Sequence, residues 1–462
     1  MVNPGHYRQE LAKVVAGRPW IVARDVLASC TNIAELLMEL GASRVMCIGG
    51  TQGSGPLPDP EIFDCTVLNV SGPDTMSVIR AADRALSDLP AEVRAKVDAF
   101  DPEGQARVIG TIFSSGRPVA DRPIYGARAP SWQALEDKLI IDDLWDRAGI
   151  YRAPREIVAA DFVELTQSAR RMDEGIGTVW VGDNAEGFHG AAAYLRWVRN
   201  DKDARAAADF FEQHCEQVRV MPFVEGISCS IHAFVFADEV IAFRPCEMVI
   251  FRRPDSNKLV YSRATTFWDP QPEDRDYMRS AVCRVGELIR SEVGYRGIFT
   301  LDGIMSAKGF VPTELNPRFG AAISTQAAAL PDLPLFVLQL AVIENEALDY
   351  RAAELEKLLL DSAYNNRRGS GLLLLTDRVD NNNEADIVRL GSGWRRADEH
   401  EEPDASLSLG PGPLGSTLRV TLVPERTPIG PPAAPLIASA LQFAGEIWNL
   451  DVGELIAAKQ VR

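Results

Sequence analysis

Two hydrophobic periods alternate along this chain. Runs rich in β-branched and aromatic residues predict strands, and apolar residues three and four positions apart predict helices. In the first 130 residues, strand-type runs lie at 19–23, 44–48, 65–70 and 107–113, and helical patterns lie at 33–40 and after Asp74. Alternating strands and helices favour a three-layer α/β lobe.

The pattern changes after residue 130. An apolar stripe in the stretch 129–154 predicts one helix that ends at Gly149. The D-x-x-E sequence at Asp161 resembles a capping box that begins a second helix. A strand is predicted at 177–181. The glycine-rich loop 182–190 is expected to open into a helix from Ala191.

The next segment consists mainly of strand-type runs, at 218–226, 228–236, 240–243, 248–251 and 259–266. Helices are predicted at 273–292 and 334–344. Consecutive strands of this kind form an antiparallel meander, so the core of the protein is expected to be α+β.

The last hundred residues are predicted to form a separate α+β unit, with strands at 371–376 and 416–423 and a helix at 435–448. The acidic and then Gly/Pro-rich stretch 398–415 is predicted to be a loop. A chain of 462 residues is too long for one compact core. We therefore expect four parts, at 1–130, 131–219, 220–362 and 363–462.

Residues 297–318 contain the most recognisable candidate metal ligands of the chain and are predicted to form a β-hairpin. Asp302 and Glu314 fall on its paired strands, and the strand period of two places Asn316 on the same face as Glu314. Two carboxylates and an amide oxygen suit Mg²⁺ that is held partly by nucleotide phosphates. Arg318 shares this face, where a guanidinium can neutralise charge that develops on a phosphoryl or acyl oxygen.

The order of these residues resembles the metal-binding strands of the ATP-grasp superfamily, an acid followed by about a dozen residues and then E-x-N-x-R. The resemblance covers residues 131–346. It implies an α/β protein with an ATP-grasp fold, a Rossmann-like pre-ATP-grasp lobe and a small C-terminal α+β unit. It also implies that Asp302, Glu314 and Asn316 hold Mg²⁺ and that Arg318 steadies the acyl-phosphate or the tetrahedral intermediate. A solvated turn with ordinary surface charges is the alternative.

The same resemblance suggests contacts for ATP. Lys138 lies where the superfamily places a lysine near the phosphates, although a helical lysine beside acids is commonly just solvated. Met221 and Phe223 lie in a segment that resembles the interlobe hinge, where apolar side chains flank adenine. Many members carry a glutamate at the place of Met221, so Glu225 is the candidate for the ribose contact. The usual second phosphate-binding lysine is missing, and His189 is the nearest candidate cation unless it is simply a solvated loop histidine.

Two further features of the sequence, a glycine-rich loop and a set of arginines, are candidates for anion binding. The glycine-rich loop 49–55 could cradle an anion, but it lacks the lysine and the serine or threonine of a phosphate loop. A plain connection and a substrate-facing loop are the alternatives. Arg244, Arg252, Arg253 and Arg263 punctuate the central strands. We assign Arg244 to a phosphate or a substrate carboxylate because a guanidinium fork matches those anions, and we expect most of the others to be surface charges.

The composition of the chain limits the classes of partner and the cellular location that are expected. A net charge of −17 argues against nucleic acid or an anionic membrane as the main partner. No apolar run approaches a membrane span, and the first residues lack the apolar core of a signal peptide, so a cytoplasmic protein is expected. The seven cysteines have no C-x-x-C spacing and are expected to be reduced core residues. The expected partners are small-molecule amino acids or peptides, and a homodimer is the candidate assembly.

The resemblance implies an ATP-dependent carboxylate–amine ligase. Such an enzyme phosphorylates a substrate carboxylate, an amine attacks the acyl-phosphate, and ADP and phosphate leave. The large N-terminal lobe and the extra C-terminal unit resemble amino-acid or peptide ligases of secondary metabolism. A biotin-carboxylase-like enzyme is one alternative, although the chain contains no A-M-K-M biotin-attachment sequence. A nucleotide-binding scaffold without turnover is the other.

Overall fold

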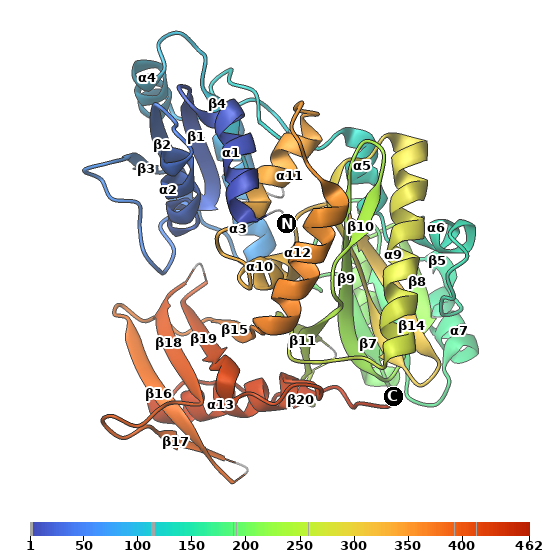
Figure 1. Ribbon diagram of the computed structural model, residues 1–462. Helices are drawn as coiled ribbons and strands as arrows, with labels where there is room; N and C mark the ends of the chain where they lie inside the picture. Colours follow the sequence, from blue (N-terminus) through green and yellow to red (C-terminus); the bar gives the residue numbers. More distant parts are fainter. Residues whose placement is uncertain are drawn as a thin grey trace.

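The computed structural model describes residues 3–111, 116–187, 189–190, 192–256, 258–391, 393–412 and 414–462. Within these residues the strands form four sheets, of four, seven, five and four strands (Figure 1). None of the described helices has both the length and the apolar character needed to cross a membrane.

The N-terminal lobe has a parallel sheet in the order β3-β2-β1-β4. Successive side chains of β1 point to opposite faces of this sheet. Trp20 and Val22 enter one apolar core, and Ile21 and Ala23 enter another. Both faces are therefore covered, as a parallel sheet requires. The elements are α1 Pro4–Val15, β1 Pro19–Val26, η1 Leu27–Ser29, α2 Thr31–Glu39, β2 Arg44–Thr51, β3 Asp64–Val67, α3 Thr75–Ser87, α4 Ala91–Phe100 and β4 Arg107–Ile109.

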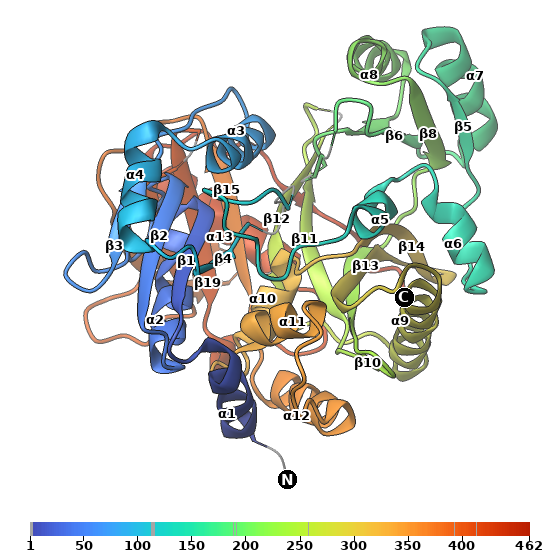
Figure 2. The ribbon, with the colours of Figure 1, turned by 90° about the horizontal axis from the view of Figure 1, so that it is seen from above.

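A linking segment leads into a small antiparallel sheet with the order β5-β8-β6-β7. Figure 2 shows this sheet with α7 and α8 at the opposite side of the molecule from the N-terminal lobe. We call it the lid sheet. The elements are α5 Pro130–Gln133, η2 Ala134–Glu136, α6 Ile141–Arg147, β5 Glu156–Ala159, α7 Phe162–Met172, β6 Thr178–Gly182, β7 Leu195–Val198, α8 Asp201–His214 and β8 Gln217–Pro222.

The core sheet has the order β12-β11-β9-β13-β14, with β10 paired to β9 and β20 paired to β11. The long helix α9 packs on β9 and β10, and its Met278, Val282 and Val285 are fully buried. The elements are β9 Ile227–Val235, β10 Val240–Ala242, β11 Cys246–Arg252, β12 Leu259–Thr265, α9 Pro272–Val293, β13 Gly297–Ser306, β14 Gly309–Asn316, α10 Ala321–Ala327, α11 Leu335–Ile343 and α12 Ala352–Asn365.

The C-terminal sheet, in the order β15-β19-β18-β16-β17, is packed by α13. Val249, Phe251 and Phe267 of the core region enter the same apolar cluster as this sheet, so the C-terminal unit shares a core with the rest of the chain. The elements are β15 Ser370–Leu375, β16 Asn383–Leu390, β17 Gly393–Arg396, β18 Ala405–Pro411, β19 Ser416–Leu422, η3 Pro424–Arg426, α13 Ala434–Trp448 and β20 Ile456–Ala457.

Three expectations about elements need correction. The predicted single helix in the stretch 129–154 is broken, because the Asp137 side chain accepts a hydrogen bond from the Leu139 N–H at 2.9 Å and the backbone leaves the helix there. The helix expected from Ala191, a residue outside the described ranges, is wrong, because β7 follows instead. The stretch 398–415 contains a strand, β18, whose leucines alternate with serines.

The strand expected at 107–113 is shorter in the described residues, where β4 ends at Ile109. Residues 112–115 lie outside the described ranges, as does Phe188 of the glycine-rich loop. Helices α1, α4, α8, α10 and α12 were not predicted, whereas α3 begins after Asp74 and α7 after Asp161, as expected.

Candidate active site

The predicted hairpin is present as β13 and β14, and it places the acids opposite one another. Asp302 pairs in register with Glu314, and Thr300 pairs with Asn316. The register shifts after Asp302, so Thr313 is an extra residue in β14. A β-bulge of this kind bends the strand and re-aims neighbouring side chains, and bulges are common beside active sites.

The side chains of the hairpin form one hydrogen-bonded group. Asp302 accepts from the Ser230 hydroxyl at 2.5 Å and from the Asn316 amide at 2.8 Å. Asn316 in turn accepts from Arg318 at 2.9 Å, and Arg318 forms an ion pair with the buried Glu136 at 3.3 Å. The structure thus brings together all four residues predicted from the E-x-N-x-R pattern.

Lys138 completes this group from the linking segment. Its ammonium lies 3.4 Å from the Glu314 carboxylate, and only 8% of the residue is exposed. Burial opposes the charge on Glu314, but Lys138 and Arg318 outweigh burial and lower the pKa of this carboxyl. Burial and the neighbouring Glu314 carboxylate instead raise the pKa of Asp302. The break at Asp137 gives the lysine this position, since Lys138 lies in the turn before α6.

The donor set fits a hard divalent cation. Asp302, Glu314 and Asn316 supply only oxygen ligands, and two carboxylates on neighbouring strands repel one another unless a cation lies between them. Among the described residues there is no group of three or more His, Cys, Asp and Glu side chains that could hold a metal. A metal at the hairpin would therefore depend on the Asn316 amide and on ligands from a bound nucleotide.

An apolar cavity of about 430 Å³ extends from this group toward the lid sheet. Met221 and Phe223 line it, together with Val179, Val181 and Ile250. The Phe223 ring stacks on Trp197 with the ring centroids 4.3 Å apart. An apolar cavity that ends at charged groups, which we call the slot, suits a nucleotide, with the base between apolar side chains and the phosphates at the polar end.

Glu225 does not lie where the ribose contact was expected. Arg252 binds its carboxylate with two nitrogens, at 2.5 and 2.9 Å, and lowers the pKa of Glu225 against the effect of burial. The Gly226 N–H also donates to it, at 3.2 Å. The described walls of the cavity include Arg252 but not Glu225, whose carboxylate is paired with Arg252.

His189 is buried near Lys138 but carries no charge near pH 7. Burial first, and then the charge of Lys138, lower the pKa of His189 to about 4. Its Nε2 lies 2.8 Å from the Asp183 carbonyl oxygen, so Nε2 carries the proton and Nδ1 is left as a buried acceptor without a partner in the structure. The ring stacks on Tyr194 at 4.1 Å. In this arrangement His189 does not replace the missing lysine.

The structure does not support the assignment of Arg244. Only 1% of this residue is exposed, and its guanidinium donates to the carbonyl oxygens of Thr266 at 2.9 Å and Trp268 at 3.1 Å. It also pairs with Asp269. Among the described residues, the wall of the 430 Å³ cavity does not include Arg244. Arg244 therefore fastens the loop between β10 and β11.

Sequence reasoning missed a buried cation in the slot, Arg219 of β8. It lines the cavity, donates to Asp142 at 2.6 Å and donates to the carbonyl of the bulged Thr313 at 3.3 Å. Both partners are nearly inaccessible, at 2% for the Arg219 side chain and 0% for Asp142. The available signal was a single arginine inside the strongly apolar stretch 218–224.

Solved structures share this architecture. N5-carboxyaminoimidazole ribonucleotide synthetase, in its ADP complex, aligns over 94% of this chain and 97% of its own with a TM-score of 0.50 and 11% identity. The biotin carboxylase domain of Hydrogenobacter thermophilus 2-oxoglutarate carboxylase, a dimer with MgADP, ADP and bicarbonate, aligns over 96% of this chain and 91% of its own with a TM-score of 0.52 and 15% identity. Campylobacter jejuni biotin carboxylase, in a β-γ-ATP complex, aligns over 89% of this chain and 88% of its own with a TM-score of 0.55 and 11% identity.

This chain has the ATP-grasp fold. The predicted fold class is confirmed. No protein-family model matches the sequence, and no curated protein matches it. At such low identities the likeness establishes the fold, and the chemistry has to be argued from the residues of this chain.

Proposed function

We propose that this protein is an ATP-dependent carboxylate–amine ligase that works with Mg²⁺. One observation carries the proposal: the slot lined by Met221 and Phe223 ends at Lys138 and at the carboxylates of the β13–β14 hairpin. An apolar slot for a base, a lysine for phosphate and oxygen ligands for a divalent cation are the parts that phosphoryl transfer from ATP requires. The solved structures of the same fold contain ADP and MgADP.

In this proposal, side chains that pair with one another in the structure are the ones that bind the nucleotide and the metal. Lys138 neutralises Glu314, so the ammonium can move to a phosphate when a metal takes over the carboxylate. Arg318 is held by Asn316 and Glu136, which fixes its guanidinium beside the acids. It can then stabilise negative charge on the acyl-phosphate oxygen. Bound Mg²⁺ would supply further positive charge at the transferring phosphoryl group.

The proposed product is an amide or peptide bond on an amino acid or a peptide. Support for this part comes from the domain arrangement, because the large N-terminal lobe and the extra C-terminal unit resemble those of amino-acid or peptide ligases of secondary metabolism, such as the peptide ligase of pheganomycin biosynthesis. A homodimer and a cytoplasmic location belong to the same proposal.

The first test is calorimetry of ATP binding with and without Mg²⁺. Wild-type protein should bind ATP in a magnesium-dependent manner, and Glu314→Ala should weaken binding because a metal ligand is lost. Glu92→Ala on α4 is the matched control, since Glu92 is exposed and lies on the N-terminal lobe. Absence of ATP binding in wild type, or equal binding by all three proteins, would contradict the proposal.

Measuring the release of ADP and phosphate distinguishes the proposed ligase from the two alternative functions. A ligase releases ADP and phosphate when an amino acid or peptide and an amine are both present, whereas a biotin-carboxylase-like enzyme releases them with bicarbonate and biotin. A nucleotide-binding scaffold binds ATP but releases neither product with any pair. The Glu314→Ala variant shows whether the release that is observed comes from this site.

A further inference from the structure

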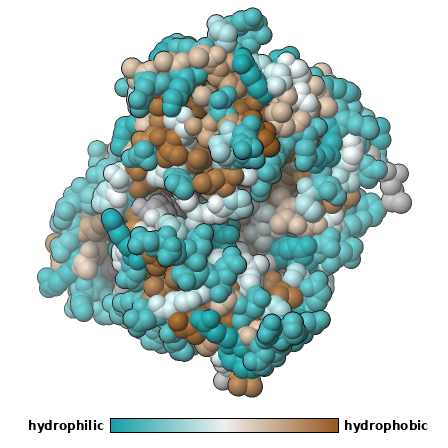
Figure 3. Space-filling model, turned by 90° about the vertical axis from the view of Figure 1, so that its left-hand side faces the viewer, coloured by the Kyte–Doolittle hydropathy of each residue, from teal (hydrophilic) through white to brown (hydrophobic). Residues whose placement is uncertain are grey.

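A second and larger cavity, of about 1130 Å³, adjoins the nucleotide slot. Five residues line both spaces, namely Thr75, Leu259, Tyr261, Gly320 and Ala321. Its walls come from the N-terminal lobe, the core sheet and β15 of the C-terminal unit. Figure 3 shows this side of the molecule hollowed between its upper and lower parts. Ligand pockets usually measure about 300–1,000 Å³, so the cavity admits more than a single amino acid.

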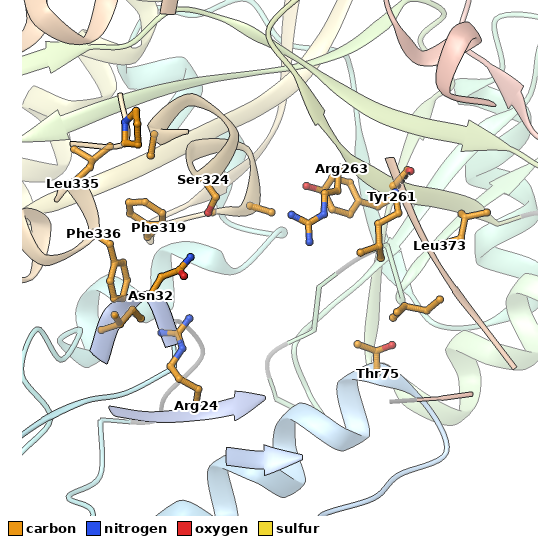
Figure 4. A pocket seen from close by; sticks show the side chains of 18 of the residues that line it. Arg24, Asn32, Thr75, Tyr261, Arg263, Phe319, Ser324, Leu335, Phe336 and Leu373 are labelled. Carbon is orange, nitrogen blue, oxygen red and sulfur yellow. Dashed lines mark hydrogen bonds between the residues drawn. The ribbon is translucent and has the colours of Figure 1, made fainter. Parts of the chain in front are cut away.

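Arg263 of β12 enters this cavity without an acidic partner. Figure 4 shows its guanidinium directed into the open space, beside Tyr261. The structure contains no hydrogen bond or ion pair from the Arg263 side chain to any described residue. A partly buried guanidinium without a counter-charge is costly, so its presence in a cavity wall indicates that an anion binds there.

A second cation lies close to Arg263, outside the described cavity wall. Arg419 of β19 repels Arg263 electrostatically and, after burial, is the main reason that the pKa of Arg263 is lowered. The Nε of Arg419 is itself buried and unpaired in the structure. Two like charges at the junction of the core sheet and the C-terminal sheet destabilise one another, and an anion bound beside Arg263 would relieve the repulsion.

Backbone geometry fixes the position of Arg263. The register of β11 and β12 shifts between Val249 and Ile250, so that Ser262 is an extra residue between Tyr261 and Arg263. The Ser262 hydroxyl accepts a hydrogen bond from the Leu372 N–H of β15 at 2.9 Å. This bulge thus docks the C-terminal sheet against the strand that carries the arginine.

Arg24 of β1 reaches the cavity from the N-terminal lobe, on the side opposite Arg263 (Figure 4). It donates to the Gly110 carbonyl oxygen at 2.9 Å and lies over the Phe336 ring at 5.4 Å, and its Nε has no partner in the structure. Glu39, one of the two acids among the described lining residues, is already paired with Arg8. The other, Glu35, is exposed. The net charge here is therefore positive, in a protein whose total charge is −17.

The rest of the lining is largely apolar and leads to the acids of the hairpin. Phe319, Leu335 and Phe336 lie on the side of Arg24 (Figure 4). Tyr261 lines both spaces. Burial first, and then Asp302, raise the pKa of Tyr261, while Arg263 and Arg318 lower it, so this side chain lies near charged groups of both sites. A molecule in the large cavity can thus present one end to Arg318 and another to Arg263.

We propose that the large cavity binds a substrate with an apolar body and two anionic groups, one reacting beside Arg318 and the other held by Arg263, with Arg24 contributing from the opposite wall. The second anion is a carboxylate or a phosphate. This inference names the substrate class of the proposed ligase and rests on that function for the reacting carboxylate, but the anion site itself does not require turnover.

The test uses three probes with one phenylpropionate skeleton: 3-phenylpropionate, with one carboxylate; benzylsuccinate, with two; and 3-(4-phosphonooxyphenyl)propionate, with a carboxylate and a phosphate. Binding is measured by calorimetry with ADP and Mg²⁺ present, so that the nucleotide site is filled, and again without nucleotide. A charge-assisted contact should make at least one of the doubly charged probes bind about tenfold or more tightly than 3-phenylpropionate. The tighter of the two identifies the second anion.

Arg263→Gln should remove this preference and leave ADP binding unchanged. Arg18→Gln, which removes the same charge at an exposed position remote from both cavities, should keep the preference. Arg24→Gln should reduce it and decides the case if Arg263→Gln does not fold, as judged by its melting temperature. Equal binding of all three probes to wild type, no binding of either doubly charged probe, or a preference retained in Arg263→Gln and Arg24→Gln would overturn the inference. Loss of ADP binding in wild type would instead count against the proposed nucleotide site.

Discussion

The buried ion pair between Asp142 and Arg219 gives the sharpest prediction about stability. Asp142 of α6 is fully inaccessible and lies 2.6 Å from the Arg219 guanidinium. Arg155 also binds it, at 2.9 Å, but its side chain is 27% exposed and can be solvated by water. Replacing Asp142 by Asn keeps the volume and removes the charge. Arg219 then remains as a buried cation with no counter-charge of comparable burial.

The expected cost follows from that burial. Removing one partner of a buried pair costs roughly 3–5 kcal/mol, because the remaining charge is left uncompensated in a medium of low dielectric constant. Asp146→Asn is the matched control on the same helix. Asp146 pairs with Arg152 at 2.8 Å, but its side chain is 54% exposed and the pair is screened by water, so it should contribute little to stability.

The assay is thermal unfolding of wild type and both variants at the same pH and salt concentration. A loss of 1 kcal/mol lowers the melting temperature by roughly 2–4 °C in a unit of 150–250 residues, so Asp142→Asn should fall well below Asp146→Asn. The double variant Asp142→Leu with Arg219→Met should recover much of the loss, since apolar residues of similar size often replace a buried pair without cost. Equal melting temperatures for the two Asn variants would refute the reasoning.

Three further predictions concern the core sheet and the slot. Glu247 accepts hydrogen bonds from the N–H groups of Ala433 at 2.7 Å and Ala434 at 3.1 Å, and burial raises its pKa from 4.5 to about 7. The folded state then keeps a proton that the unfolded state releases, so the contribution of Glu247 to stability is present below pH 4.5 and lost as the pH rises toward 7. Urea midpoints should show a smaller loss between these pH values in Glu247→Gln, and identical pH slopes would contradict this. Arg244→Gln should lower the melting temperature without changing ATP affinity in calorimetry. Weaker ATP binding by the folded variant would show that Arg244 contributes to the nucleotide site. Phe223→Ala should weaken ATP binding about tenfold through lost stacking, whereas unchanged affinity would place adenine elsewhere.

The hairpin could be predicted because the residues that define it lie close together in the sequence. Strand alternation alone places Glu314 and Asn316 on one face, and the turn between the strands brings Asp302 opposite Glu314. The apolar slot was also found in part, since Met221 and Phe223 line it as expected. These inferences need only the spacing of residues in neighbouring strands.

The choice among the arginines could not be made from spacing. Arg244 follows a strand-type run and Arg263 lies within one, but Arg244 is surrounded by carbonyl oxygens of a loop and Arg263 faces a cavity made by three lobes. The break before α6 was missed for a different reason. Helical spacing of apolar residues continues across Asp137, and only its side-chain hydrogen bond shows that the backbone leaves the helix.

The two bulges explain how lobes that are distant in sequence form one site. At the hairpin, the extra residue Thr313 offers its carbonyl oxygen to Arg219 of the lid sheet. In β12, the extra residue Ser262 accepts the N–H of Leu372 from the C-terminal sheet. Each bulge leaves a polar group outside the regular ladder, and each group is satisfied by a different lobe. The lid is thereby fixed against the acids, and the C-terminal unit against the wall that carries Arg263, so both cavities depend on lobes outside the core sheet.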